Sequence, residues 1–431
     1  MGKRVHVRDL KKGMYVIDLD CPWTETSFLF QGLELQTDGE LHELRRVCEY
    51  VYVYDPTDVG DASRVRPRAI VEADVPQAAT PHGEDRQAEV LAASQAVRRG
   101  PSIHGEPIAL EAEMPAAQAI ETDARTLVYT MLDDARLGRN VDMAGLRRVI
   151  SGMVDSVVRN PDALVWFTHL RDKDQYTALH SIRVAILALA FGRHLDLSVP
   201  ELNILGIGAL LHDIGKVKVP SDILNKPERL TDREFEIVKG HVPEGVKILE
   251  SARDFPMAAI EVAAGHHERY QGGGYARGLS GERIGLFGIM AAIVDSYDAI
   301  TSDRAYHAGI SPYEALGKFY AMRNKEYHGG LVDQFIQCLG TYPIGSIVEM
   351  STGDVGVVIA VDRKHFLRPI VALARRADGT PIAPGTVLDL AAGSDRSARD
   401  REIRRVLPAK AHGIDPADYI PGRPQLKANL A

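Results

Sequence analysis

Apolar residues recur at intervals of three and four over the central part of the chain, which is the period of an amphipathic helix. One such stripe consists of Leu146, Val149, Ile150, Met153, Val154 and Val157. Side chains on one stripe of a helix must be buried against neighbouring elements. Further stripes of the same kind lie at 181–195, 201–214, 232–250, 255–266 and 286–302. An all-helical bundle is therefore predicted over 112–344.

Both ends of the chain show a different pattern, in which short apolar or alternating runs are separated by turn residues. Near the amino terminus the runs cover 14–19, 28–36 and 51–54, and a helix is expected over 40–48. After residue 344 the runs are I-G-S-I-V-E-M, V-G-V-V-I-A-V and P-I-V-A-L-A. The expected fold is mainly α, with a small α+β module at 1–65. A β-rich appendage followed by a polar tail is expected at 345–431.

Residues 66–111 are dominated by Ala, Pro, Gly, Arg and Glu, as in A-A-T-P-H-G-E-D-R. Such a composition offers few large apolar side chains, so it cannot bury a core of its own. This segment is therefore interpreted as a flexible linker between the amino-terminal module and the helical bundle.

Composition narrows the class of ligand. The chain has 431 residues and a formal charge of −8, which disfavours a nucleic-acid polymer or an anionic membrane surface as partner. Its 3 cysteines form no C-x-x-C motif, so neither a disulfide scaffold nor a zinc ribbon is expected. The amino terminus has no apolar signal-peptide region, and no apolar run of about 18 residues follows. A cytoplasmic protein acting on a small ligand is expected.

The helical region also carries a concentration of histidine and aspartate that chance does not explain. These residues are His180, His212, Asp213, His241, His266, His267 and Asp295. Imidazole and carboxylate donors without thiolate suit two adjacent divalent metal ions, and they favour iron, manganese, nickel or zinc over calcium. Iron or manganese is expected, with nickel or zinc as the alternatives. A centre of this kind is typical of enzymes that hydrolyse phosphate esters. Histidines outside this region, such as His6 and His42, are interpreted as ordinary core or surface residues.

His212 and Asp213 end the apolar run L-G-I-G-A-L-L. Because Gly215 suits the left-handed conformation that often follows a helix, the pair is expected at a helix terminus, where the carboxylate can bridge two metals. Lys216 lies three residues after Asp213 and is a candidate to donate to a phosphate oxygen or to the leaving alkoxide. The alternative is that Lys216 is a solvated lysine of the K-V-K run.

A second group of candidates follows the helix expected from about residue 286. Asp295, Asp298 and Ser302 share one helical face. Asp295 is the expected ligand, while Asp298 and Ser302 lie behind it and Asp298 orients an imidazole. Arg304 follows the same face and is a candidate guanidinium clamp for a phosphate. Arg277 flanks the glycine-rich run Q-G-G-G-Y-A-R-G and is a weaker candidate for substrate binding, because glycine runs are more often simple turns.

The order and spacing of these motifs closely resemble the HD-GYP family, a branch of the HD-domain metal-dependent phosphohydrolases that degrades cyclic di-GMP. The matching segments are H-S-I-R-V at 180, L-L-H-D-I-G-K at 210, H-V-P-E-G at 241, G-H-H-E-R at 265, G-Y-A-R-G-L at 274 and V-D-S-Y-D-A-I-T-S-D-R at 294. The resemblance covers about 140–345. Residues 1–65 are similar to an uncharacterised module common ahead of such domains.

The resemblance implies that the seven histidines and aspartates are the metal ligands, with Asp213 bridging. It also implies that Lys216 and Arg304 contact the phosphates, and that one phosphodiester is cut to give pGpG, with GMP as a further product in some members. The chain departs from the family at Ala276, which replaces the signature proline. Tyr176 stands where some members have a glutamate for a third metal, so a binuclear centre is expected.

The expected function is therefore a metal-dependent cyclic di-GMP phosphodiesterase. The alternative is a regulatory module with weak or no activity, which binds the cyclic dinucleotide or docks onto a diguanylate cyclase (GGDEF) domain. Turnover of cyclic di-GMP by the metal-loaded protein discriminates between these two functions.

Overall fold

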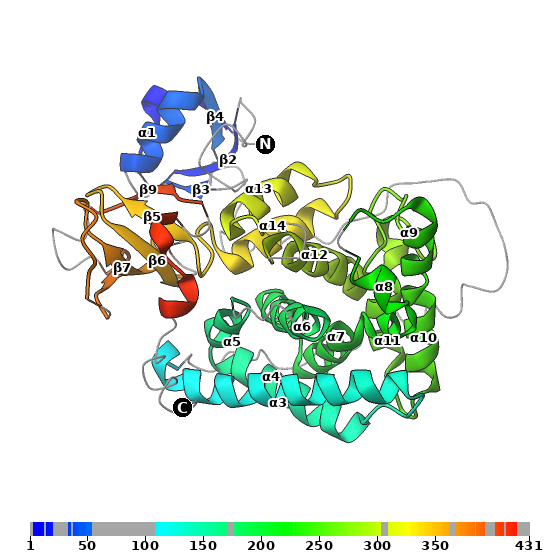
Figure 1. Cartoon of the computed structure of the whole chain (residues 1–431). Helices are drawn as coiled ribbons and strands as arrows, with labels where there is room; N and C mark the ends of the chain where they lie inside the picture. Colours follow the sequence, from blue (N-terminus) through cyan, green and yellow to red (C-terminus); the bar gives the residue numbers. More distant parts are fainter. Residues whose placement is uncertain are drawn as a thin grey trace. The chain divides into compact units, whose positions relative to one another are not determined.

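The computed structural model describes residues 3–12, 14–19, 33–35, 38–53, 108–169, 176–226, 228–302, 309–362, 365, 367–383, 385–392, 401–408 and 411–419. They belong to two compact units, 1–99 and 100–431. The second unit is built mostly of helices, with a small sheet near its carboxyl end (Figure 1). The expected mainly α fold class is confirmed.

The first unit contains a four-stranded antiparallel sheet and the helix α1 (Asp38–Val47). The strands lie in the order β1 (Lys3–His6), β4 (Tyr50–Val53), β2 (Tyr15–Leu19) and β3 (Leu33–Glu34). Val16, Leu44 and Val51 are fully buried and contribute to its core. β2, β3, β4 and α1 agree with the predicted runs and helix, whereas β1 was not predicted. Part of the run 28–36 and residue 54 lie outside the described residues.

The second unit begins with a bundle of helices. Their bounds are α3 (Leu110–Arg136), α4 (Met143–Arg159), α5 (Pro161–Phe167), α6 (Tyr176–His194), α7 (Val199–Leu211), α8 (Ser221–Leu224), α9 (Asp232–Lys239), α10 (His241–Ser251), α11 (Met257–Gly265), α12 (Leu286–Thr301), α13 (Pro312–Ala321) and α14 (Gly329–Leu339). Short 3₁₀ helices η5 (Ile214–Lys218) and η6 (Gly281–Ile284) join some of them.

Helices α6 and α7 form the centre of this bundle. α6 contacts α3, α4, α5, α7, α12 and α14, and α7 also contacts α4 and α11. Both helices are apolar on nearly all sides, as a helix surrounded by others must be. The start of α7 is stabilised by a capping box between Ser198 and Glu201. Among the described residues, no helix is both long enough and apolar enough to cross a bilayer.

The stripe predicted as one helix over 232–250 is in fact two helices, α9 and α10. The break falls at Gly240, and Pro243 lies in the first turn of α10. Proline has no N–H to donate to the carbonyl of Lys239, so it cannot continue the ladder of α9. His241 is placed at the start of a helix as a result.

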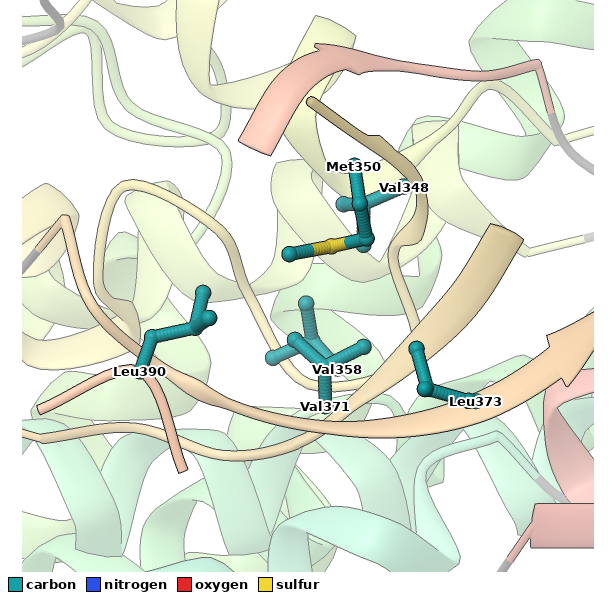
Figure 2. Close-up of a cluster of buried hydrophobic side chains, with 6 residues drawn as sticks. All are labelled: Val348, Met350, Val358, Val371, Leu373 and Leu390. Atoms are coloured by element: carbon teal, nitrogen blue, oxygen red, sulfur yellow. The ribbon is translucent and has the colours of Figure 1, made fainter. Parts of the chain in front are cut away.

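The carboxyl-terminal sheet is antiparallel, in the order β8 (Val387–Asp389), β7 (Ile370–Arg375), β6 (Val355–Ala360), β5 (Ile347–Met350) and β9 (Ile403–Val406). Figure 2 shows its core, which is made of Val348, Met350, Val358, Val371, Leu373 and Leu390. Strand β9 lies within the region 345–431 but is not one of the apolar runs predicted there. Its residues pair with β5, and Ile403 and Val406 pack against the core.

Two hydrogen bonds attach this sheet to α5. Trp166 is fully buried, and its Nε1–H donates to the carbonyl of Ile359 over 2.8 Å. The carboxylate of Asp162 accepts from the backbone N–H of Val361 over 3.2 Å. The sheet is therefore attached to the bundle through polar groups whose hydrogen bonds are satisfied.

Gly215 does not have the left-handed conformation expected from the sequence. It lies inside η5, and its φ is not positive. A Cβ at this position would overlap the carbonyl oxygen of His241 and the backbone nitrogen of Gly245. Glycine is required here because the backbones of η5 and α10 approach each other closely, which brings Asp213 near His241.

We expect Gly215→Ala to lower the free energy of unfolding of the second unit by about 1–3 kcal/mol, because the added methyl group must push α10 away. Differential scanning calorimetry would measure the change. Gly317→Ala is the matched control, because a Cβ on this glycine of α13 meets no atom within 4 Å. It should leave the transition unchanged or raise it. Equal transition temperatures for both variants would contradict the packing argument.

Candidate metal centre

The structure brings together the seven histidines and aspartates that the sequence singled out. They form two donor groups, within each of which the potential ligand atoms all lie within 4.8 Å of one another. The first donor group is His180, His212 and Asp295, and the second is Asp213, His241, His266 and His267. All are buried except His267, which is partly exposed. Each group has the number and type of donors that hold one divalent cation.

Three of the imidazoles are oriented in the same way. Each stands at the junction after a helix, and its Nδ1–H donates to a carbonyl three residues earlier in the last turn of that helix, where carbonyls lack intrahelical partners. The pairs are His212 with Ala209 (2.7 Å), His241 with Val238 (2.6 Å) and His266 with Ala263 (2.7 Å). This bond fixes the ring and leaves Nε2 as the donor atom toward the centre.

The Asp213 carboxylate lies between the two donor groups. Its Oδ2 is 3.3 Å from Nε2 of His212 and 3.5 Å from Nε2 of His180. Its Oδ1 is 3.2 Å from Nε2 of His241 and 3.7 Å from Nε2 of His266. One oxygen therefore faces each group, which is the arrangement that a bridging carboxylate requires.

Asp295, in the middle of α12, also reaches both groups. Its Oδ1 is 3.0 Å from Nε2 of His180, and its Oδ2 is 3.8 Å from Nδ1 of His267. One turn later, Asp298 accepts a hydrogen bond from Nδ1 of His180 over 2.7 Å. Asp298 thereby orients the His180 ring, because the opposite nitrogen is left facing Asp295.

Arg183 is a participant that the sequence reasoning missed. Its guanidinium donates to both oxygens of Asp298, over 2.7 and 3.0 Å, and the residue is buried. The signal was present in the motif H-S-I-R-V, where Arg183 lies three residues after His180 on one helix face. Ser302 caps the end of α12, and its N–H donates to the carbonyl of Asp298 over 3.0 Å.

The electrostatics keep the carboxylates charged. Burial raises the pKa of Asp213, but the ammonium of Lys216 and the His212 ring outweigh burial and hold that pKa well below its usual range. The same balance holds for Asp295. Burial raises its pKa, but the hydrogen bond and charge of His180 outweigh burial and hold that pKa well below its usual value. For Asp298, burial is outweighed by Arg183 and His180, so the pKa is about 2.

The pKa values of the imidazoles are shifted in different directions. Burial lowers the pKa of His266 to about 4, and burial with the neighbouring His266 lowers the pKa of His267 well below its usual value. Both rings are therefore neutral at pH 7, which is the state that binds metal. Burial also lowers the pKa of His180, but its hydrogen bonds to Asp295 and Asp298 outweigh burial and raise that pKa.

The residues fit a divalent cation. Nε2 of His212 and Oδ1 of Asp213 are buried, and neither makes a hydrogen bond of normal geometry among the described residues. A buried polar atom without a partner is costly, by about 1–3 kcal/mol, and is rare in native proteins. These two atoms belong to opposite donor groups, so a cation in each group would satisfy both.

The lysine and arginines predicted to bind substrate differ in how they lie relative to the donor groups. The Lys216 ammonium donates to Oδ2 of Asp213, and the side chain is 20% exposed, so it borders the donor groups. The Arg277 guanidinium donates to Glu261 on α11 over 2.8 Å. Arg304 lies outside the described residues.

A loop beside the second donor group is held by Glu268, which sequence reasoning also missed. This buried carboxylate accepts the backbone N–H of Arg277 over 2.7 Å and that of Leu279 over 3.0 Å. The loop places the Tyr275 ring against His267, with centroids 4.6 Å apart and planes inclined by 31°. Glu268 follows His267 directly in H-H-E-R, so its position in that motif was the available signal.

Two protein-family profiles indicate the class of protein to which the chain belongs. The HD domain profile matches residues 166–331, and the profile of a domain of unknown function, DUF3391, matches residues 2–146. The chain is thus an HD-domain protein with an uncharacterised amino-terminal domain.

Three relatives of known name indicate the family within this class. The chain is 34% identical over 392 residues to the cyclic di-GMP phosphodiesterase PA4108 of Pseudomonas aeruginosa, covering 90% of this chain and 89% of that protein. It is 36% identical to a cyclic di-GMP phosphodiesterase of Thermotoga maritima, over 38% of this chain and 45% of the relative. A 3'3'-cGAMP-specific phosphodiesterase 2 of Vibrio cholerae is 32% identical over 38% of this chain and 32% of its own length. The chain belongs to the HD-GYP family, which confirms the resemblance noted from its motifs.

We expect Asp298→Asn to weaken metal binding by about 10–100-fold, because the His180 ring loses its charged partner and Arg183 is left buried without a counter-charge. Competition with a chelator would measure the affinity. Asp333→Asn is a matched control, since Asp333 also accepts from an arginine, Arg323, over 2.7 Å. Similar losses in both variants would show that the effect is not specific to His180.

We expect Glu268→Gln to accelerate hydrogen exchange at the amides of Arg277 and Leu279 by about 10–100-fold, because the amide side chain cannot accept both bonds and a bond to a charged group is worth about 1.5–3 kcal/mol. Exchange followed by mass spectrometry would detect the change. The control is Glu282→Gln, whose exposed carboxylate accepts from the hydroxyl of Tyr270. Unchanged exchange in the loop would mean that other contacts hold it.

Proposed function

We propose that this protein is a metal-dependent phosphodiesterase that hydrolyses a 3'-5' bond of cyclic di-GMP to give pGpG. The observation that carries the proposal is the pair of adjacent donor groups that share the carboxylate of Asp213. The relative that supports the proposal is the Pseudomonas aeruginosa protein, which is named a cyclic di-GMP phosphodiesterase and aligns with 90% of this chain.

The proposed centre is binuclear. His180, His212 and Asp295 would hold one cation, and His241, His266 and His267 the other, with Asp213 between them. The proposed metals are iron or manganese, with nickel or zinc as alternatives, and nitrogen and oxygen donors without thiolate suit all four. The position of a third-metal ligand one turn before His180 is taken by Tyr176, which begins α6. Divalent cations, when bound, lower the pKa of water and neutralise phosphate charge.

The protein's own groups have separate roles in this proposal. Asp213 is held ionised by Lys216 and the surrounding imidazoles, so it keeps a fixed negative charge between the donor groups. The Lys216 ammonium is the cation nearest to that carboxylate, and we assign to it the proton for the departing 3' oxygen. It would also contact a phosphate oxygen.

Two arginines complete the proposal. Arg304 is proposed as a guanidinium clamp on a phosphate, as its motif suggests. Arg277 would have to exchange its bond with Glu261 for one with the substrate. Docking onto a diguanylate cyclase through the loop of Tyr275 also stays a prediction.

The activity can be tested with purified protein loaded with Mn²⁺ or Fe²⁺ and incubated with cyclic di-GMP. Release of pGpG, separated by chromatography, is expected. His180→Ala should reduce turnover by about 100-fold or more, because the first donor group loses a ligand. His194→Ala is the matched control on the same helix, and it should retain activity, since the His194 ring contacts Gln334 instead.

Metal content separates the proposed enzyme from the regulatory alternative. About two equivalents of metal with turnover support the phosphodiesterase. Tight binding of cyclic di-GMP without release of pGpG would identify a regulatory module and overturn the proposal.

A further inference from the structure

Three side chains form a continuous rim beside the second donor group: Tyr275, Phe235 and Lys239. The Tyr275 ring lies 4.6 Å from the His267 ring and 6.5 Å from the His241 ring, measured between centroids. Phe235 packs against Tyr275 edge to face, with centroids 6.0 Å apart. The rim therefore extends from the proposed metal ligands outward to α9.

Lys239 gives this rim a positive charge. Its ammonium lies 5.2 Å from the centroid of Phe235 and 5.8 Å from that of Tyr275. Glu236 pairs with the same ammonium over 2.5 Å, and its side chain is 69% exposed. Because this ion pair is near the surface, it is weak and leaves Lys239 able to attract an anion.

Phe235 is not part of the buried core. Phe235 is 45% exposed, and α9 contains no buried residue. α9 contacts mainly α8 and α10. A single exposed apolar residue is ordinary on a protein surface. Phe235 differs because it extends a chain of ring contacts that begins at the donor groups.

We propose that Phe235 stacks on a purine base of the substrate and that Lys239 attracts its phosphates. This inference rests on the proposed function and adds the subsite that holds the nucleoside. In a nucleotide the base is one ribose away from the phosphate, so a phosphate at the donor groups carries its base outward along the rim. Aromatic side chains bind bases through their π-faces, with about 1–3 kcal/mol per base.

Binding of a non-hydrolysable phosphorothioate analogue of cyclic di-GMP to the metal-loaded full-length protein tests this subsite without requiring turnover. Phe235→Ala should raise the Kd about tenfold, as measured by titration calorimetry. Phe235→Trp should restore the Kd to within about twofold of the unmodified protein, because it keeps an aromatic face. Ile237→Ala, on the same helix and 41% exposed at that position, should leave the Kd unchanged.

A ligand without a base separates stacking from damage to the metal centre. Ribose 5-phosphate should bind Phe235→Ala as it binds the unmodified protein. For the charge, Lys239→Gln should weaken analogue binding more than Lys247→Gln does. Both lysines pair with a glutamate three residues earlier over 2.5 Å, which makes the two variants comparable.

Several outcomes would overturn the subsite. These are an unchanged Kd for Phe235→Ala, an equal loss of affinity for ribose 5-phosphate, and no binding of the analogue by the unmodified protein. Failure of the proposed reaction looks different, because it would appear as absent pGpG release while the analogue still binds in a manner that depends on Phe235.

Discussion

The arrangement of the centre depends on one buried carboxylate, that of Asp213. Its two oxygens face different groups of imidazoles, and the ammonium of Lys216 bonds to the oxygen that faces His180 and His212. A buried carboxylate without such partners would take up a proton, because a low dielectric disfavours its charged form. Here the neighbouring positive charge and hydrogen bonds reverse that tendency. The two cations of the proposed centre would share this carboxylate, which stays negative.

The bundle supplies this centre through the ends of its helices. A helix leaves its last carbonyls without partners, and an imidazole placed just after the helix can satisfy one of them with Nδ1. His212, His241 and His266 all do so, which fixes three rings by one local device. His180 lies inside a helix and has no such carbonyl available, so its ring depends on Asp298 and, through Asp298, on Arg183.

The fold also decides what surrounds the centre. The backbone of α10 can approach η5 only because residue 215 has no side chain, and Pro243 helps to end α9 where His241 must begin the next helix. On the other side, Glu268 holds the loop that places Tyr275 beside His267. Tyr275 and α9 together form the rim to which we assign the base of the nucleotide.

Much of this protein can be read from its sequence. Local periodicity is enough to predict helices, so the mainly α class, the stripes of α4, α6, α7, α11 and α12, and most strands agree with the structure. The donor residues stand out because imidazoles and carboxylates are scarce in apolar helices.

Other features depend on contacts between residues far apart in the chain. No local pattern specifies the pairing of Trp166 with Ile359 or of Phe235 with Tyr275. The position of Arg183 one turn after His180 is local, but its partner Asp298 lies on another helix. Strand β9 could not be predicted for a similar reason. Two apolar residues in a charged segment form a strand only when they can pair with the edge of β5. The candidate metal ligands could be named from their residue types and spacing alone. Their division into two groups, with one oxygen of Asp213 facing each group, is seen only in the folded chain, because those distances depend on how the helices pack.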